Sequence, residues 1–138
     1  MSSLPPSICN LPTLRTLDIS HNLITHLPHT IGHLANLEYL VAIANRLTAL
    51  PGPGLARLSR LLGLYLSRNQ LTGVPGHLAE CGSLCELYLD HNRLVSLPAG
   101  LASGLTQLAI LSLAGNQLTW LPPLPFLSCP RSGAEHYF

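Results

Sequence analysis

The sequence predicts an α/β fold, a curved, horseshoe-like solenoid with parallel strands on its concave face and short helical or 3₁₀ turns on its convex face. Three observations predict it. Five segments of the chain superimpose on one another and begin at intervals of 23, 24, 23 and 24 residues. Each opens with leucines that alternate with variable residues, which is the period of a strand. Each then continues with apolar residues three or four positions apart, which suits a helical turn with one inward face.

The five segments share the template LxxLxLxxNxLxxLP and start at Leu14, Leu37, Leu61, Leu84 and Leu108. Self-similarity at a fixed period predicts units that cannot bury their own apolar residues and therefore stack on their neighbours. We expect an incomplete N-terminal repeat at residues 1–13, repeats over 14–127 of which the last is incomplete, and a non-repeat tail at 128–138. In a chain of 138 residues, these make one domain.

The first half of each repeat is predicted to be a short strand with one buried face. The leucines of the LxL pair point inward, and β-branched or aromatic residues such as Val41, Tyr65 and Tyr88 fit the positions between and around them. The inward residues include Leu64, Leu66, Leu87 and Leu89, which we expect in the core.

One asparagine recurs where the strand of each repeat must turn away from the sheet. These residues are Asn22, Asn45, Asn69, Asn92 and Asn116. An amide side chain both donates and accepts hydrogen bonds, so it can satisfy backbone groups that the turn leaves unpaired inside the stack. We interpret the five residues as a structural ladder and not as ligand-binding groups.

The second half of each repeat follows a Leu-Pro pair and is predicted to turn helically back to the next strand. The same pattern is visible at the start of the chain, where Leu4 and Pro5 take the Leu-Pro slot with Ile8 and Leu11 behind them. Neither end shows a polar capping unit, which repeat arrays normally need. Self-association of the chain through apolar ends is therefore a further expectation.

With its LxxLxLxxN cores and LPxxIxxLxx continuations, the chain resembles the leucine-rich-repeat family from Leu4 to about Pro122. In particular, it is similar to the intracellular type found in a Ras-pathway scaffold and in plant intracellular Ras-group-related repeat proteins. This resemblance implies a protein-binding scaffold and a place in intracellular signalling, including small-GTPase pathways. It identifies the fold much more specifically than the function.

Function in a repeat array is expected where the repeats differ, on the strand residues of the concave face. Neighbouring strands lie about 4.8 Å apart, so Tyr65 and Tyr88 should be side by side, with Val41 next in the row and Tyr39 close by. Rigid aromatic groups beside charged groups are typical of binding hot spots. The predicted contact residues are Tyr39, Tyr65, Tyr88, Glu86, Asp90, Arg68, Asp18 and His91. The alternative is that the tyrosines only fill strand positions, which favour aromatic residues without any partner.

Composition argues against several other partners. Charged residues make up only 9% of the chain, and the formal net charge of +1 gives no electrostatic case for nucleic acid. Every apolar run is interrupted, so membrane insertion is not expected, and the N-terminus lacks the pattern of a secretory signal. The cysteines, Cys9, Cys81, Cys85 and Cys129, are scattered and form no CxxC pair, which favours a reduced, cytoplasmic location.

Three weaker patterns in the sequence could indicate a metal site, a catalytic site and a ligand of SH3 domains. His21, His26, His29 and His33 crowd one repeat, but the template places them on different sides of it, so no metal site is expected. Ser67, His91 and Asp90 lie near one another on the predicted sheet, yet an open surface lacks the enclosure that catalysis needs. The PxxP spacing of Pro122–Pro125 matches a ligand of SH3 domains, but a proline-rich cap that simply ends the solenoid is the preferred interpretation.

The sequence thus predicts a non-enzymatic interaction scaffold without cofactors, whose concave face binds a protein of unknown identity. The competing prediction is a truncated or alternative-product repeat fragment with no binding activity of its own, or a structural piece of a larger assembly.

Overall fold

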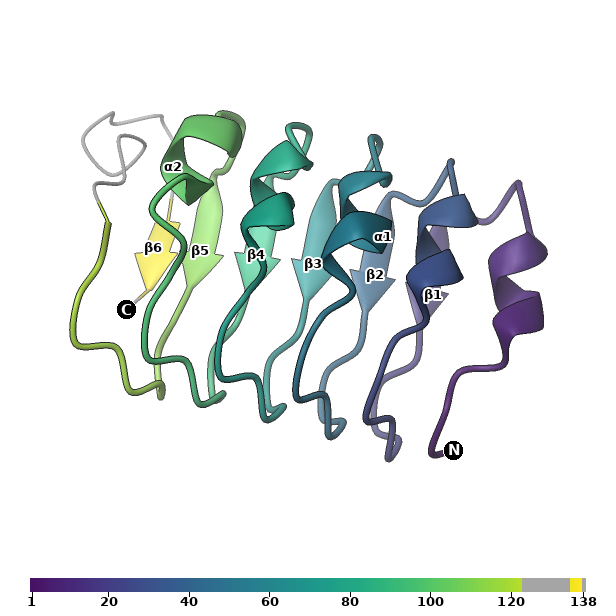
Figure 1. Ribbon diagram of the computed structural model, residues 1–138, viewed down its shortest axis with the longest axis horizontal. Helices are drawn as coiled ribbons and strands as arrows, with labels where there is room; N and C mark the ends of the chain where they lie inside the picture. Colours follow the sequence, from purple (N-terminus) through teal and green to yellow (C-terminus); the bar gives the residue numbers. More distant parts are fainter. Residues whose placement is uncertain (123–134, 138) are drawn as a thin grey trace.

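A computed structural model of the chain describes residues 1–122 and 135–137. Six strands, β1 to β6, form one parallel sheet in chain order. Short helical elements lie on the opposite side of each turn, so the sheet and the helices form two layers (Figure 1). The expected solenoid of parallel strands and short helical turns is confirmed.

Each strand is three residues long, and β1 to β5 occupy corresponding template positions. They are β1 Thr16–Asp18, β2 Tyr39–Val41, β3 Gly63–Tyr65, β4 Glu86–Tyr88, β5 Ile110–Ser112 and β6 Glu135–Tyr137. The register is the one expected from the repeats, with Leu17, Leu40, Leu64, Leu87 and Leu111 aligned across the sheet. Each of these leucines is at most 5% exposed, whereas the residues on either side of them face away from the core.

The return segments are the 3₁₀ helices η1 Pro6–Asn10, η2 His29–His33 and η3 Gly76–Glu80 and the short α-helices α1 Gly52–Ala56 and α2 Leu101–Gly104. η1, η2, α1 and η3 directly follow a proline that comes after a leucine or, in η3, after Val74, and α2 begins three residues after Pro98. The proline carbonyl accepts a hydrogen bond from the first helical turn, as from Ile31 to Pro28 and from Leu78 to Pro75. Proline suits this position because it has no N–H of its own to satisfy and its φ is already close to helical.

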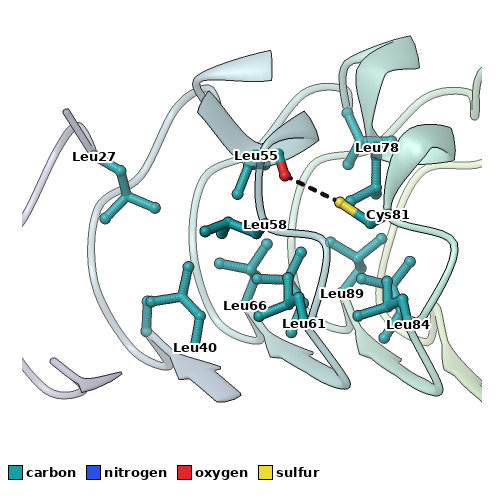
Figure 2. Close-up of a cluster of buried hydrophobic side chains, with 14 of the residues drawn as sticks. Leu27, Leu40, Leu55, Leu58, Leu61, Leu66, Leu78, Cys81, Leu84 and Leu89 are labelled. Atoms are coloured by element: carbon teal, nitrogen blue, oxygen red, sulfur yellow. Dashed lines mark hydrogen bonds between the residues drawn. The ribbon is translucent and has the colours of Figure 1, made fainter. Parts of the chain in front are cut away.

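The core lies between the sheet and the helical layer. Leucines from both halves of each repeat point into it and contact those of the neighbouring repeats (Figure 2). Most of them are fully buried, including the predicted core residues Leu64, Leu66, Leu87 and Leu89. Burial of this kind contributes roughly 1.5–3 kcal/mol for each such side chain.

The asparagine ladder joins consecutive repeats. The side chain of Asn69 accepts a hydrogen bond from the Leu47 amide at 3.0 Å, and its Nδ2 donates to the carbonyls of Ala42 and Leu66. Asn45, Asn92 and Asn116 make the equivalent bonds in their own repeats. Asn22, with no complete repeat before it, donates only to Ile19 and Ser20.

The N-terminal half-repeat differs from the other repeats at Leu11. This residue takes the template position of the buried Leu34 but is 48% exposed, while Cys9 is only 1% exposed. The equivalents of Leu11 are covered by the repeat before them, and η1 has no such neighbour. Cys9 is instead covered from the other side, where η1 packs on η2.

At the other end of the sheet, β6 pairs in parallel with β5 through Ile110 and Glu135. The tail, whose sequence does not match the repeat template, extends the sheet by one strand through residues 135–137. Without β6, β5 would be an edge strand, and the unpaired backbone groups of an edge strand readily accept another strand. Residues 128–134, Cys129 and all but the first residue of the PxxP segment lie outside the described residues.

Candidate functional site on the open face of the sheet

The side of the sheet turned away from the leucine core carries the variable residues of the repeats, and we call it the open sheet face. Strand register places its residues in two rows. One row contains Thr16, Tyr39, Gly63, Glu86 and Ile110, and the other contains Asp18, Val41, Tyr65, Tyr88 and Ser112. The concave face expected from the sequence corresponds to these rows.

Three tyrosines gather at the centre of this face. The rings of Tyr65 and Tyr88 are stacked, with centroids 5.0 Å apart and planes inclined by 13°. The rings of Tyr39 and Tyr65 both approach Gly63, which has no side chain to keep them apart. We call Tyr39, Tyr65 and Tyr88 the tyrosine strip. Stacked pairs of this geometry contribute about 0.5–1.5 kcal/mol beyond the burial of their surface.

Two carboxylates on β4 and just after it are bonded to the neighbouring repeat. The Tyr65 hydroxyl donates a hydrogen bond to Glu86 Oε2, and Ser67 Oγ donates to Asp90 Oδ1 at 2.6 Å. Burial raises the pKa of the Tyr65 phenol well above its ordinary value, and the hydrogen bond to Glu86 and the charge of that carboxylate raise it further. The phenol is therefore a proton donor at physiological pH.

The remaining predicted contact residues lie farther from the tyrosine strip. Asp18 is exposed on the edge strand β1, with Val41 between it and Tyr65 in its row. Its Oδ1 accepts a hydrogen bond from the Ser20 amide at 3.0 Å, and hydrogen bonds from Ser20 lower the pKa of the Asp18 carboxyl. Asp18 therefore stays ionised at the margin of the open sheet face.

Arg68 and His91 lie in the turns next to the asparagine ladder, and the left-handed backbone of these turns was not predicted from the sequence. The template position after the strand adopts a left-handed backbone in every repeat, with φ between 54° and 70° at His21, Ala44, Arg68, His91 and Gly115. Side chains there leave the sheet at its carboxyl end, and both Arg68 and His91 are exposed. Gly115 was the one sequence signal for this turn, because glycine adopts positive φ most readily.

The arrangement does not support catalysis by Ser67, His91 and Asp90. Ser67 donates its hydrogen bond to Asp90, whereas a nucleophile would need a bond to the base, His91. The His91 ring lies instead against Gly115. A hollow of about 410 Å³ is lined by Leu113, Leu118 and Trp120 and lies at the end of the fifth repeat, away from the tyrosine strip.

The histidine-rich first repeat gathers no metal ligands. Within residues 1–122 no three His, Cys, Asp or Glu side chains lie close enough together to hold an ion. His26 Nδ1 is 2.8 Å from Thr25 Oγ1 instead. Cys9, Cys81 and Cys85 are free thiols. Over the same part of the chain, no helix has the length and apolarity needed to cross a bilayer.

Comparison with models of protein families shows to which family the chain belongs. A model of the leucine-rich repeat matches residues 2–47, 43–94 and 82–131. The chain belongs to the leucine-rich-repeat family. Proteins of this family generally mediate protein–protein interactions, and their repeat fold is typically a non-enzymatic binding module.

Solved leucine-rich-repeat structures share the fold. A leucine-rich-repeat protein of Leptospira interrogans is 29% identical with a TM-score of 0.86, and the match covers 100% of this chain and 34% of that one. The ectodomain of the receptor kinase GASSHO1/SCHENGEN3 of Arabidopsis thaliana, in complex with CASPARIAN STRIP INTEGRITY FACTOR 2, is 36% identical with a TM-score of 0.75, over 83% of this chain and 14% of that one.

The plant peptide hormone receptor RGFR1, in complex with RGF2, is 32% identical with a TM-score of 0.75, over 83% of this chain and 19% of that one. The chain thus spans about a third or less of the length of these relatives. No curated protein sequence matches it significantly.

Proposed function

We propose that this leucine-rich-repeat chain is an interaction scaffold that captures a protein segment on its open sheet face. The tyrosine strip forms the centre of the contact, with Glu86, Asp90 and Arg68 beside it. Asp18 and His91 lie at the margins. The single observation that carries the proposal is the stacking of Tyr65 on Tyr88 above a core that is already closed.

The tyrosines are not needed to complete that core. Leu64 and Leu87, beneath the stacked pair, are fully buried by the other repeats. Tyr39, Tyr65 and Tyr88 are each only partly buried, so apolar ring surface remains in contact with water. Tyrosine is enriched at binding hot spots because it offers a large, rigid contact area together with a polar group.

The solved relatives support a polypeptide ligand. GASSHO1/SCHENGEN3 was solved in complex with CASPARIAN STRIP INTEGRITY FACTOR 2, and RGFR1 is a peptide hormone receptor in complex with RGF2. By analogy, this chain would bind a peptide or an exposed segment of a protein.

The intracellular subtype of the repeats and a cytoplasmic location are part of the same proposal. The LPxxIxxL continuations favour the intracellular subtype and a signalling role in the cytoplasm, and the free thiols of Cys9, Cys81 and Cys85 are compatible with a reducing compartment. The plant receptor relatives favour an extracellular position instead. Imaging of the tagged natural protein in intact cells would separate the two.

The test is affinity capture from cells with the wild-type chain and the double variant Tyr65→Ala, Tyr88→Ala. Loss of a central aromatic hot spot usually costs 2 kcal/mol or more, so captured partner should fall by more than about tenfold. Circular dichroism should show an intact fold, because the leucines below are unchanged.

Trp120→Ala is the matched control, because Trp120 is an aromatic residue that is 56% exposed outside the tyrosine strip. Equal capture by the wild type and the double tyrosine variant would exclude the open sheet face. If the wild-type chain captures nothing specifically, the alternative of a structural fragment without binding activity is favoured.

A further inference from the structure

Gly63 stands out among the residues of the open sheet face because it is a glycine in β3, a strand in the middle of the sheet, where it is the first residue. Its counterparts in the other repeats all have side chains, namely Thr16, Tyr39, Glu86 and Ile110. Glycine weakens a strand interior, and where it occurs it often marks the close approach of another group. Its backbone is not in the left-handed region, so conformation does not require it.

Two tyrosine rings occupy the space that a side chain at Gly63 would fill. A Cβ on this residue would lie 2.7 Å from Cε2 of Tyr65 and 2.8 Å from Cδ1 of Tyr39. Both distances are far below the 3.5–4.0 Å at which carbon atoms pack comfortably. The rings of Tyr39 and Tyr65 therefore rest on β3 at Gly63.

Glu86 holds the other end of the Tyr65 side chain. Glu86 is the partner of Gly63 on the next strand, and its Oε2 accepts the hydrogen bond of the Tyr65 hydroxyl. The Tyr65 ring thus reaches diagonally from its own position, across Gly63, to the neighbouring strand. Tyr88 stacks on the ring in this orientation.

We infer that Gly63 and Glu86 are positioning residues, which hold the tyrosine strip in a preformed arrangement for the partner segment. This inference rests on the proposed function. Gly63 provides the space in which the rings of Tyr39 and Tyr65 lie, and Glu86 fixes the direction of Tyr65. A side chain that is ordered before binding loses little freedom on binding, which strengthens affinity by roughly two- to tenfold for each such side chain.

The test uses Gly63→Ala, Glu86→Ala and Glu86→Gln in the full chain. The near-ultraviolet circular dichroism of the tyrosines reports their packing without any partner. Gly63→Ala should displace the rings and reduce this signal, and Glu86→Ala should reduce it by releasing Tyr65. Glu86→Gln should retain most of it, because the amide oxygen still accepts the hydrogen bond.

A second readout follows the ionisation of the phenols by ultraviolet absorbance at alkaline pH. Tyr65 should ionise at higher pH than an ordinary phenol in the wild type, since burial opposes its phenolate most, followed by the hydrogen bond to Glu86 and the charge of that carboxylate. Glu86→Ala and Glu86→Gln should both make it ionise at lower pH. Only Glu86→Ala should also lower the dichroism.

Gly82→Ala is the matched control, because the space around Gly82 is open and an added methyl group meets nothing. It should leave both readouts as in the wild type. If Gly63→Ala does not fold, the two Glu86 variants still decide the inference. Unchanged dichroism and tyrosine titration in Gly63→Ala and Glu86→Ala would overturn it.

Affinity capture then separates the inference from the proposed function. If the rings are positioned as described, Gly63→Ala should reduce captured partner several-fold. Altered spectra with unchanged capture would uphold the positioning of the rings and remove the open sheet face as the binding site.

Discussion

Asn69 shows how one side chain can join two repeats. Its oxygen accepts the amide of Leu47 and its nitrogen donates to the carbonyl of Ala42, both in the repeat before it, while a further bond to Leu66 closes its own turn. The residue is 7% exposed, so water cannot readily replace these bonds.

Replacement of Asn69 by alanine should lower the free energy of unfolding by about 1–3 kcal/mol, because it leaves buried backbone groups without partners. Asn22→Ala is the matched control, since Asn22 bonds only to carbonyls of its own repeat. Urea unfolding should show the larger loss for Asn69→Ala. An equal effect of the two variants would argue against a ladder between repeats.

Cys81 takes a core position that leucine fills in most repeats, and its thiol donates a hydrogen bond to the Leu55 carbonyl (Figure 2). Burial raises the pKa of the thiol from 9.0 to about 11, and the charge of Glu80 contributes further. The folded chain therefore holds this proton more tightly than the unfolded chain does.

Because the pKa of Cys81 is raised on folding, its contribution to stability is present below pH 9 and is lost between about pH 9 and 11. The loss is roughly 2–3 kcal/mol, at 1.36 kcal/mol for each pH unit. Urea unfolding of the wild type and Cys81→Ala across this range should show a shallower pH dependence in the variant. Parallel curves would show that folding does not raise the pKa of this thiol.

At the scale of the elements, the length of a repeat matches the kind of helical turn it contains. The two repeats of 23 residues contain η2 and η3, while the two of 24 residues, starting at Leu37 and Leu84, contain α1 and α2. An α-helical turn takes 3.6 residues where a 3₁₀ turn takes 3.0, so the extra residue is accommodated in the helical layer. The strands therefore keep their register despite the unequal spacing.

The helical elements also pack closely on one another. A Cβ on Gly104 of α2 would lie 2.0 Å from the backbone oxygen of Ala79 in η3. That oxygen is part of the chain and cannot rotate away, in contrast to the rings that surround Gly63. The spacing of α2 and η3 is thus set by the absence of a side chain at residue 104.

Gly104→Ala should therefore force the two elements apart and lower the free energy of unfolding by about 1–3 kcal/mol, the usual range for overpacking. Gly100→Ala is the matched control in the same segment, because nothing lies near an added methyl group there. Thermal unfolding of both variants measures the difference. A Gly104→Ala variant as stable as Gly100→Ala would show that the helical layer adjusts freely.

For the whole molecule, the parts that repeat could be predicted and the parts that depend on single contacts could not. The leucine core, the strand register and the neighbouring positions of Tyr65 and Tyr88 follow from residues that recur every 23 or 24 positions. The contact of two rings with Gly63 and the bond from Tyr65 to Glu86 depend on side-chain directions that no periodicity encodes. The exposure of Leu11 likewise depends on having no complete repeat before it.

The N-terminal end of the array exposes two adjoining apolar side chains. Leu23 is 49% exposed, and its amide bonds to the carbonyl of Met1, which is 52% exposed. The same template position is polar in the other repeats, where it is occupied by Arg46, Gln70, Arg93 and Gln117. Exposed apolar groups that adjoin one another favour association.

We therefore expect the 138-residue chain to self-associate weakly through this end. A patch of two side chains is much smaller than the roughly 800 Å² per partner of a stable interface, so dissociation constants of about 0.1–1 mM are expected. Sedimentation velocity at increasing concentration should detect the association, and Leu23→Gln should abolish it by making the position resemble the other repeats.

Val95→Thr is the control. Val95 is 50% exposed in the fourth repeat, and the equivalent position of every other repeat is occupied by threonine. If Leu23→Gln associates as strongly as Val95→Thr, or if the wild type remains monomeric near 1 mM, the N-terminal end is not a self-association surface.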